Sequence, residues 1–254
     1  MHGYAVISDV HANLHALEAV FGRIHEMEID RIICLGDVVG YGPHPDRCVD
    51  LVIRCCSTIV LGNHDEAVIN PRREEEFNGP ARQAIVWTRS VLDPLHMDAI
   101  RRLRAVEYPQ EMVMCVHDSP VDAPTDYIHD PHIAALAFRG LLKPICLLGH
   151  THVPMVFEAP GSDADHDVTA AEVVAYLTPD GVPIALDPQR RYICNPGSVG
   201  QPRDADPRAS FAVLDLENRA FTVHRQEYDI DAAQAATQEA GLPTVLADRL
   251  AIGA

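Results

Sequence analysis

The chain has 254 residues, a formal net charge of −17 at pH 7 and 47% hydrophobic residues. This negative charge disfavours non-specific binding to nucleic acid and to anionic membranes, because the long-range field repels both. No apolar stretch approaches the roughly 18–20 residues needed to span a bilayer, and no basic leader precedes the first apolar run, so we expect a cytoplasmic protein without membrane contact.

The first half of the chain alternates apolar runs with segments of helical periodicity. Residues 4–36 predict a strand, a helix whose N-cap is Asn13, and a second strand. Another helix begins around Pro43 and leads into the strand that ends at Asn63. Alternating strands and helices of this kind indicate a mostly parallel sheet.

The strand pattern then stops between residues 70 and 104, where the periodicity predicts a helical insertion over one rim of the sheet. Strands return at 106–108 and 112–116, and a short helix over 132–142 precedes a strand at Ile145. After His152 the pattern predicts a second, largely antiparallel sheet, built from short strands at 154–157, 172–177, 183–186, 191–194, 210–216 and 220–225.

The tail has helical character over 230–240 and 244–252, which places it on the surface or at a contact between subunits of a homo-oligomer. Neither an internal repeat nor a low-complexity linker interrupts the chain. Residues 1–254 are therefore expected to form a single domain that includes the insertion and the tail.

Five of the apolar runs end in side chains that can bind metal. In a parallel sheet, the side chains just beyond the carboxyl ends of the strands converge on one crevice. We therefore expect five strands to bring these residues to one edge of a sheet. The set comprises Asp9, His11, Asp37, Asn63, His64, His117, His150 and His152.

Carboxylate, imidazole and amide groups together suit a borderline divalent metal such as Mn, Fe, Co, Ni or Zn. The set lacks cysteine, which excludes a structural zinc site of the thiolate type. Eight candidates exceed the needs of one tetrahedral ion, and they suit two ions about 3.5–4 Å apart that share a carboxylate. Each residue alone has an ordinary structural alternative, such as a turn, a helix cap or a hydrogen-bonded histidine, but five coincident strand ends favour a metal site.

These residues also stand in the order of a known family. The resemblance to the calcineurin-like metallophosphoesterases rests on five motifs: Asp9-Val10-His11, Gly36-Asp37, Gly62-Asn63-His64-Asp65, Val116-His117 and Gly149-His150-Thr151-His152. Gly40–Pro43 and Asn195–Arg203 resemble the small bacterial and archaeal phosphoesterase branch. The resemblance implies an α/β (α+β) fold, a four-layer αββα sandwich of two mixed β-sheets flanked by helices, with a dinuclear metal site at the carboxyl ends of strands.

The resemblance also implies a role for each strand-end residue. Two divalent transition-metal ions are expected, with Mn preferred and Fe, Zn, Ni or Co as alternatives. The first ion would take Asp9, His11 and His152, the second Asn63, His117 and His150, and Asp37 would bridge the two.

In this family the metal ions generate a hydroxide that attacks phosphorus in line. The resemblance implies that His64 donates a hydrogen bond or a proton to the leaving oxygen, and that Asp65 orients His64. The expected substrate is a phosphorylated small molecule, preferably a phosphodiester or a nucleotide-like compound.

Three residues outside the metal set are candidates for substrate binding, each with a structural alternative. The alternative role is a helix N-cap for Asn13, packing of its own loop for Tyr41, and a salt bridge to Asp204 or Asp206 for Arg203. The carboxylate of Asp118, beside His117, has two open interpretations. It either supports a metal ligand from behind or repels an anionic substrate.

Three alternatives to a phosphodiesterase remain. A protein serine/threonine phosphatase or a phosphomonoesterase is weakened because Gly40-Tyr41 stand where the protein phosphatases have an Asp-Arg pair. A non-catalytic metal-binding scaffold is weakened because every ligand type and His64 are present. An amidohydrolase is disfavoured because the His-x-His pair comes late in the chain and the second half is rich in strands.

Overall fold

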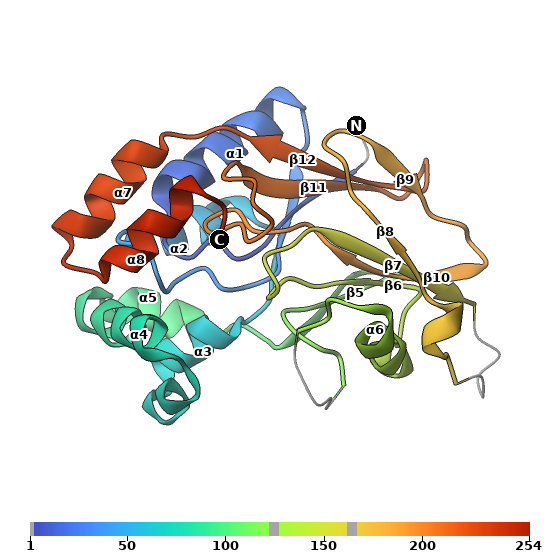
Figure 1. Ribbon diagram of the computed structural model, residues 1–254, viewed down its shortest axis with the longest axis horizontal. Helices are drawn as coiled ribbons and strands as arrows, with labels where there is room; N and C mark the ends of the chain where they lie inside the picture. The colour runs from blue at the N-terminus through green and yellow to red at the C-terminus, as the bar shows by residue number, and fades with distance from the viewer. Residues whose placement is uncertain (1–2, 122–126, 162–166) are drawn as a thin grey trace.

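The structure is a computed structural model that describes residues 3–121, 127–161 and 167–254. Two six-stranded sheets pack face to face, and helices cover the outer face of each (Figure 1). This arrangement is the four-layer αββα sandwich with two mixed sheets, so the expected fold class is confirmed.

The first sheet contains the strands at the start of the chain. Its order is β3 (Thr58–Ile59), β2 (Arg31–Cys34), β1 (Tyr4–Ile7), β11 (Ala209–Asp215), β12 (Ala220–Gln226) and β9 (Pro183–Ala185). The strands β1, β2 and β3 are parallel, whereas β11 runs antiparallel to β1 with Tyr4 opposite Leu214.

The second sheet contains the strands from the middle of the chain. Its order is β4 (Val106–Gln110), β5 (Val113–Val116), β6 (Ile145–Leu147), β10 (Arg190–Asn195), β7 (Met155–Pro160) and β8 (Val174–Tyr176). Here β5, β6 and β10 are parallel, and the remaining pairs are antiparallel.

Two expectations about the sheets were wrong. The five apolar runs do not share one sheet, because β1, β2 and β3 belong to the first and β5 and β6 to the second. The later strands do not form a separate sheet either, since β9, β11 and β12 complete the first sheet and β7, β8 and β10 complete the second. Apolar alternation shows which faces of a strand are buried, but it does not identify the neighbouring strand.

The alternation in β1 shows how the layers form. Ala5 and Ile7 pack outward against α1 (Leu14–Glu26) and α2 (Pro45–Cys55), while Tyr4 and Val6 pack between the sheets. On the far side, α6 (Pro131–Ala137), followed by the 3₁₀ turn Phe138–Gly140, covers the outer face of the second sheet. Another 3₁₀ turn, Ala170–Glu172, packs against α6.

The helical insertion starts earlier than expected. It begins with α3 (Asn63–Ile69) and continues through the 3₁₀ helix Pro71–Glu76, α4 (Gly79–Val91) and α5 (Pro94–Ile100). The motif Asn63-His64-Asp65 therefore forms the first turn of a helix, directly after a very short strand.

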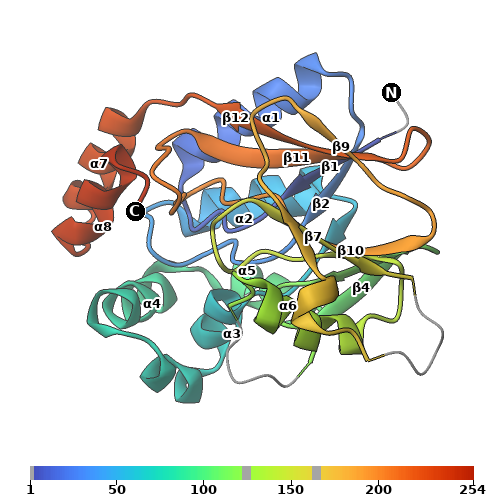
Figure 2. The same ribbon diagram turned by 45° about the vertical axis from the view of Figure 1, so that its right-hand side comes forward.

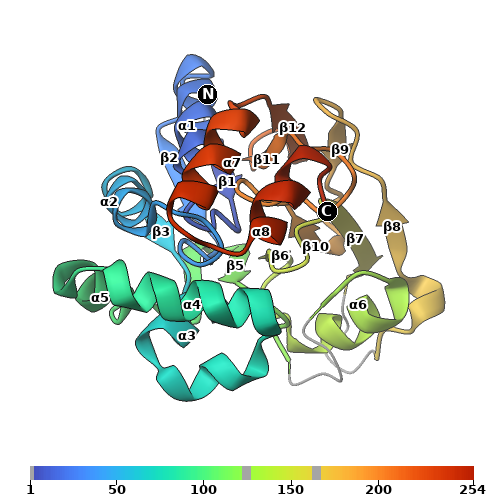
Figure 3. The same cartoon turned by 60° about the vertical axis from the view of Figure 1, so that its left-hand side comes forward.

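The tail forms the two expected helical segments, α7 (Ile230–Glu239) and α8 (Thr244–Asp248), the latter extended by the 3₁₀ turn Arg249–Ala251. The tail and insertion helices lie at the same end of the sheets (Figures 1 and 2). Figure 3 views this end, where α8 lies above α4. Leu242 and Leu246 of the tail share a small buried cluster with Tyr41, Ala81 and Ala84.

Among the described residues, no helix is both long enough and apolar enough to cross a membrane.

Candidate metal centre

All seven predicted ligands meet where strands of the two sheets end. Six of them are buried and Asn63 is half-buried. Asp9, His11, Asp37 and Asn63 follow strands of the first sheet, whereas His117, His150 and His152 follow strands of the second. The centre therefore lies across the line where the two sheets meet.

The first cluster contains Asp9, His11 and His152, whose potential ligand atoms all lie within 4.8 Å of one another. The two Nε2 atoms of His11 and His152 are 3.0 Å apart. Asp9 Oδ1 lies 3.3 Å from Nε2 of His152 and 3.8 Å from Nε2 of His11. One carboxylate oxygen and two imidazole nitrogens thus point at a common position.

The second cluster places Asn63 among His117, His150 and Asp37. Asn63 Oδ1 lies 3.0 Å from His117 Nε2 and 3.2 Å from His150 Nδ1. Asp37 Oδ2 is 3.3 Å from His117 Nε2 and 3.7 Å from His11 Nε2, so this oxygen faces both clusters. Its position is the one that a bridging carboxylate requires.

Backbone carbonyls orient three of the histidines. A carbonyl only accepts hydrogen bonds, so the ring nitrogen that contacts it carries the hydrogen and the other nitrogen presents its lone pair to the centre. The Nδ1 atoms are 3.3, 2.8 and 2.5 Å from these carbonyl oxygens, in the pairs His11 with Val39, His117 with Leu35, and His152 with Gln201. His150 is turned the other way and directs Nδ1 inward.

These side chains fit two divalent cations. Asp9 Oδ1 is buried and has no hydrogen-bond partner, although an unsatisfied buried carboxylate oxygen is costly. Burial opposes ionisation of Asp9 and Asp37, but the surrounding imidazoles outweigh it and hold the pKa of both carboxyls below their usual value. Burial also lowers the pKa of His150, to about 3, which leaves its ring neutral and able to bind metal.

The backbone is strained at this centre. Five of the seven predicted ligands have a left-handed backbone, a conformation that residues other than glycine adopt uncommonly. Such strain concentrates at functional sites and persists where the surrounding structure enforces it. The φ angles lie between 49° and 66°, at His11, Asp37, Asp9, His152 and His150.

Two glycines of the motifs leave room for the carboxylates. A Cβ atom at Gly62 would lie 2.1 Å from Oδ1 of Asp37, and one at Gly149 would lie 2.6 Å from Oδ2 of Asp9. Both distances are far below a normal contact, so any side chain at either position would displace a predicted ligand.

His64 faces the centre, but Asp65 does not support it in the expected way. The Asp65 carboxylate accepts hydrogen bonds from the backbone N–H groups of Val39, at 3.0 Å, and Gly62, at 3.1 Å. His64 Nδ1 is buried without a hydrogen-bond partner. The predicted orientation of His64 by Asp65 is therefore wrong, because Asp65 is the third residue of α3 and its carboxylate caps that helix.

Ring contacts hold His64 instead. Its centroid lies 4.4 Å from that of Tyr41, 4.7 Å from that of Phe77 and 4.8 Å from that of His11. Burial lowers the pKa of His64 to about 4, so the imidazole is uncharged at neutral pH. An uncharged imidazole donates one hydrogen bond.

A cavity of about 200 Å³ opens above this centre. Tyr41 and Arg203 line it together with Asp118, Asn63 and His64. Tyr41 both packs its loop, through its ring, and reaches the cavity, so neither of its two predicted roles excludes the other.

Asn13 is not among the residues that line this cavity. Its Oδ1 accepts a hydrogen bond from the Ala16 N–H, as expected for the N-cap of α1, and its Nδ2 donates to the Gly200 carbonyl at 2.9 Å. Substrate contact by Asn13 stays a prediction, since both ends of its amide are engaged within the protein.

Six lining residues were missed by the sequence reasoning: Arg73, Glu76, Phe77, Asn78, Ala81 and Tyr127. Tyr127 packs on His150 with ring centroids 4.2 Å apart. Five of the six lie in the helical insertion, which the sequence does predict to cover one rim. Residue type alone gave no signal, because a single aromatic or charged side chain in an insertion is usually solvent-facing.

The model of the calcineurin-like phosphoesterase superfamily domain matches residues 3–219, and the chain belongs to this superfamily. The resemblance found in the sequence is therefore confirmed. Membership implies divalent metal ions, and the two clusters supply fitting ligands.

Individual relatives agree over nearly the whole chain. A metallophosphoesterase from Sphaerobacter thermophilus of known crystal structure is 40% identical, with a TM-score of 0.85 and 99% of each chain covered. The uncharacterised protein MJ0912 of Methanocaldococcus jannaschii is 33% identical over 98% of this chain and 97% of its own. The hypothetical protein PH1004 of Pyrococcus horikoshii shares the fold at 18% identity, with a TM-score of 0.75 and coverage of 99% and 98%.

Proposed function

We propose that this protein hydrolyses a phosphodiester or a nucleotide-like phosphate ester of low molecular weight, using two divalent metal ions, with manganese as the preferred metal. The observation that carries the proposal is the pair of ligand clusters that share Asp37 beneath a cavity, with His64 in the cavity wall.

Each of the two clusters would hold one metal ion. Asp9, His11 and His152 would hold one ion, Asn63, His117 and His150 the other, and Asp37 both. When bound, the ions activate water and neutralise charge on the phosphoryl oxygens. The protein holds its ligands by burial, by the backbone carbonyls behind the imidazoles and by the close-packed glycines, so little reorganisation accompanies binding.

His64 is the proposed donor to the leaving oxygen. Its backbone N–H donates to Asp37 Oδ1 at 2.8 Å, which fixes the residue against the proposed bridging ligand. Its neighbour Asn63 faces the metal position, so the imidazole stays available to the substrate. Donation by a positioned side chain typically contributes about 10²–10⁴-fold to a rate.

The cavity walls favour a small substrate over a folded phosphoprotein. Phe77, Asn78 and Ala81 of the insertion and Tyr127 surround the space above the ligands. The aromatic rings beside His64 and His150 offer apolar surface to the two substituents of a diester. The Asp-Arg pair typical of the protein phosphatase branch is absent from Gly40-Tyr41.

The test is a comparison of bis-p-nitrophenyl phosphate with p-nitrophenyl phosphate in Mn²⁺, after metal analysis of protein purified without chelator. We expect bound metal and a higher kcat/KM for the diester. A strong preference for the monoester would reject the diesterase, and protein that stays inert with two bound ions would support the non-catalytic scaffold.

A further inference from the structure

In the part of the chain that the structure describes, the positive charge of Arg203 has no carboxylate partner. Its side chain lines the cavity, and one guanidinium nitrogen lies 3.3 Å from the hydroxyl of Tyr41 and 3.1 Å from Oε1 of Gln201. Both partners are uncharged. Nε of Arg203 is buried without a hydrogen-bond partner.

The expected salt bridges of Arg203 do not form. Asp204 pairs with Arg225, and Asp206 pairs with Arg208 at 2.7 Å. Within residues 3–121, 127–161 and 167–254, no carboxylate forms an ion pair with Arg203, although the whole chain has a net charge of −17. A partly buried guanidinium with only neutral partners retains its affinity for an anion.

The backbone around Arg203 is tied to the metal centre. Its N–H donates to the carbonyl of His152 at 3.2 Å, and the preceding loop is held where the Ser198 hydroxyl donates to the carbonyl of Asp9 at 2.8 Å. The guanidinium group therefore has a fixed position relative to two proposed ligands. Such preorganisation lowers the entropy cost of binding an anion.

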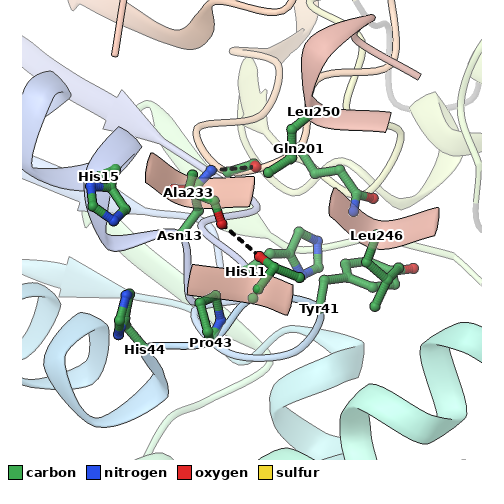
Figure 4. A pocket seen from close by; sticks show the side chains of 13 residues that line it. His11, Asn13, His15, Tyr41, Pro43, His44, Gln201, Ala233, Leu246 and Leu250 are labelled. Atoms are coloured by element: carbon green, nitrogen blue, oxygen red, sulfur yellow. Dashed lines mark hydrogen bonds between the residues drawn. The ribbon is translucent and has the colours of Figure 1, made fainter. Parts of the chain in front are cut away.

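Tyr41 shows on which side of the centre Arg203 lies. Its ring centroid is 4.4 Å from that of His64 and 4.5 Å from that of His11, and the Arg203 guanidinium carbon lies 5.8 Å from it. Figure 4 shows Tyr41 between His11 and Leu246 of α8. Tyr41 therefore brings Arg203 close to His64, the proposed donor to the leaving oxygen, as well as to His11.

The tail carries another arginine, Arg249, whose charge is felt at Arg203 but which is not among the residues that line the cavity. Burial lowers the pKa of Arg249, and the nearby positive charge of Arg203 lowers it further. The Nε of Arg249 donates to the carbonyl of Ala254. Two arginines near one another strengthen the local attraction for an anion.

We infer that Arg203, held by Tyr41, binds a second phosphate group, carried by the leaving group of the substrate. The inference rests on the proposed function, because the position of the leaving group is taken from the role of His64 as donor to the leaving oxygen. It narrows the substrate class to phosphate esters or anhydrides whose leaving group is itself phosphorylated, as in polyphosphorylated nucleotides.

The first test measures how tightly the protein binds two anions that differ by one phosphate group. Orthophosphate and pyrophosphate are titrated calorimetrically into Mn²⁺-loaded wild type, Arg203→Met and the matched control Arg208→Met, which removes an arginine paired with Asp180 and Asp206 outside the cavity. We expect Arg203→Met to weaken pyrophosphate binding about tenfold or more, the loss of one charge-assisted contact. Orthophosphate binding should change less than about twofold, and the control should change neither.

If Arg203→Met weakens the binding of both anions equally, Arg203 contacts the phosphoryl group at the metal ions, and the inference is overturned. Unchanged binding of both would make Arg203 purely structural, which also overturns it. If Arg203→Met loses selectivity for pyrophosphate but the wild type hydrolyses no diester, the proposed function is rejected while the second phosphate site remains.

The second test locates that site relative to the leaving group. Methyl 4-nitrophenyl phosphate is compared with its analogue carrying a phosphonate on the nitrophenyl ring. The wild type should favour the charged leaving group by about tenfold more than Arg203→Met does. An equal preference in both proteins would overturn the assignment to the leaving side.

Discussion

Substitution of Gly62 by alanine should disable the metal centre although it replaces none of the predicted ligands. The backbone of Gly62 has φ −89° and ψ 167°, which alanine adopts without strain. The added Cβ would lie 2.1 Å from Asp37 Oδ1 and 2.2 Å from Asp37 N, against about 3.4 Å for an ordinary contact. Asp37 must therefore retreat by the difference, about 1.3 Å, and a side-chain rotation alone does not relieve the backbone contact.

The cost has two parts. Overpacking of this kind destabilises a fold by about 1–3 kcal/mol. Displacement of groups that set ligand geometry typically lowers metal affinity about 10–100-fold. We expect Gly62→Ala to fold, to unfold at lower urea concentration, and to bind Mn²⁺ at least tenfold more weakly in a calorimetric titration of metal-free protein.

Gly22→Ala is the matched control. Apart from its chain neighbours and the backbone of its own helix, nothing lies within 4 Å of a Cβ built at Gly22, which sits inside α1. Alanine there should stabilise the protein by about 0.5–1 kcal/mol, because helix interiors disfavour glycine, and should leave metal binding unchanged. Wild-type affinity for two Mn²⁺ ions in Gly62→Ala would refute the argument from packing.

Four further outcomes are expected. Asp37→Asn should lose bound metal, measured by elemental analysis, together with diester hydrolysis. His64→Ala should keep both ions but lose about 10²–10⁴-fold in kcat, most for poor leaving groups, so that loss of metal would contradict its role. Chelator should lower the melting temperature and Mn²⁺ should restore it, because a ligand of the native state stabilises that state. Burial opposes protonation of His96, but three neighbouring aspartates outweigh this effect and raise its pKa above 6.5. The charged form therefore contributes to the free energy of unfolding in full below pH 6.5. This contribution is lost as the pH rises through the higher pKa of the folded state. Urea unfolding between pH 5.5 and 8.5 should show this loss in wild type and not in His96→Gln.

The candidate centre could be predicted from sequence because each of its parts is local. A buried run that ends in Asp, Asn or His presents a polar side chain at a strand end, and five such ends leave few other arrangements. The same local logic placed Asn13 at the N-cap of α1 and the helices of the tail.

The partition into two sheets could not be predicted in this way. Strand β11 joins β1 across some two hundred residues, and the alternation of Ala5, Val6 and Ile7 is the same whichever strand lies beside it. Register and partner depend on how both faces of each sheet are covered, which is a property of the whole chain.

The role predicted for Asp65 was wrong for a related reason. An acid beside a catalytic histidine and an acid at the third position of a helix have the same spacing in sequence, and the second role was not considered because α3 was not expected to start at Asn63. Arg203 shows the opposite case. Its sequence neighbours Asp204 and Asp206 suggested a local ion pair, but Asp204 pairs with Arg225 of β12 and Asp206 with Arg208.

The position of the centre between the two sheets has a mechanical consequence. Each cluster takes side chains from both sheets: His152 joins Asp9 in one, and His117 joins Asn63 in the other. A bound ion would then act as a cross-link between layers that apolar packing and hydrogen bonds such as that of His117 with Leu35 also join. Loss of metal should weaken the interface between the sheets before either sheet unfolds. Amide hydrogen exchange should therefore become faster first along β1 and β6 and last in α1.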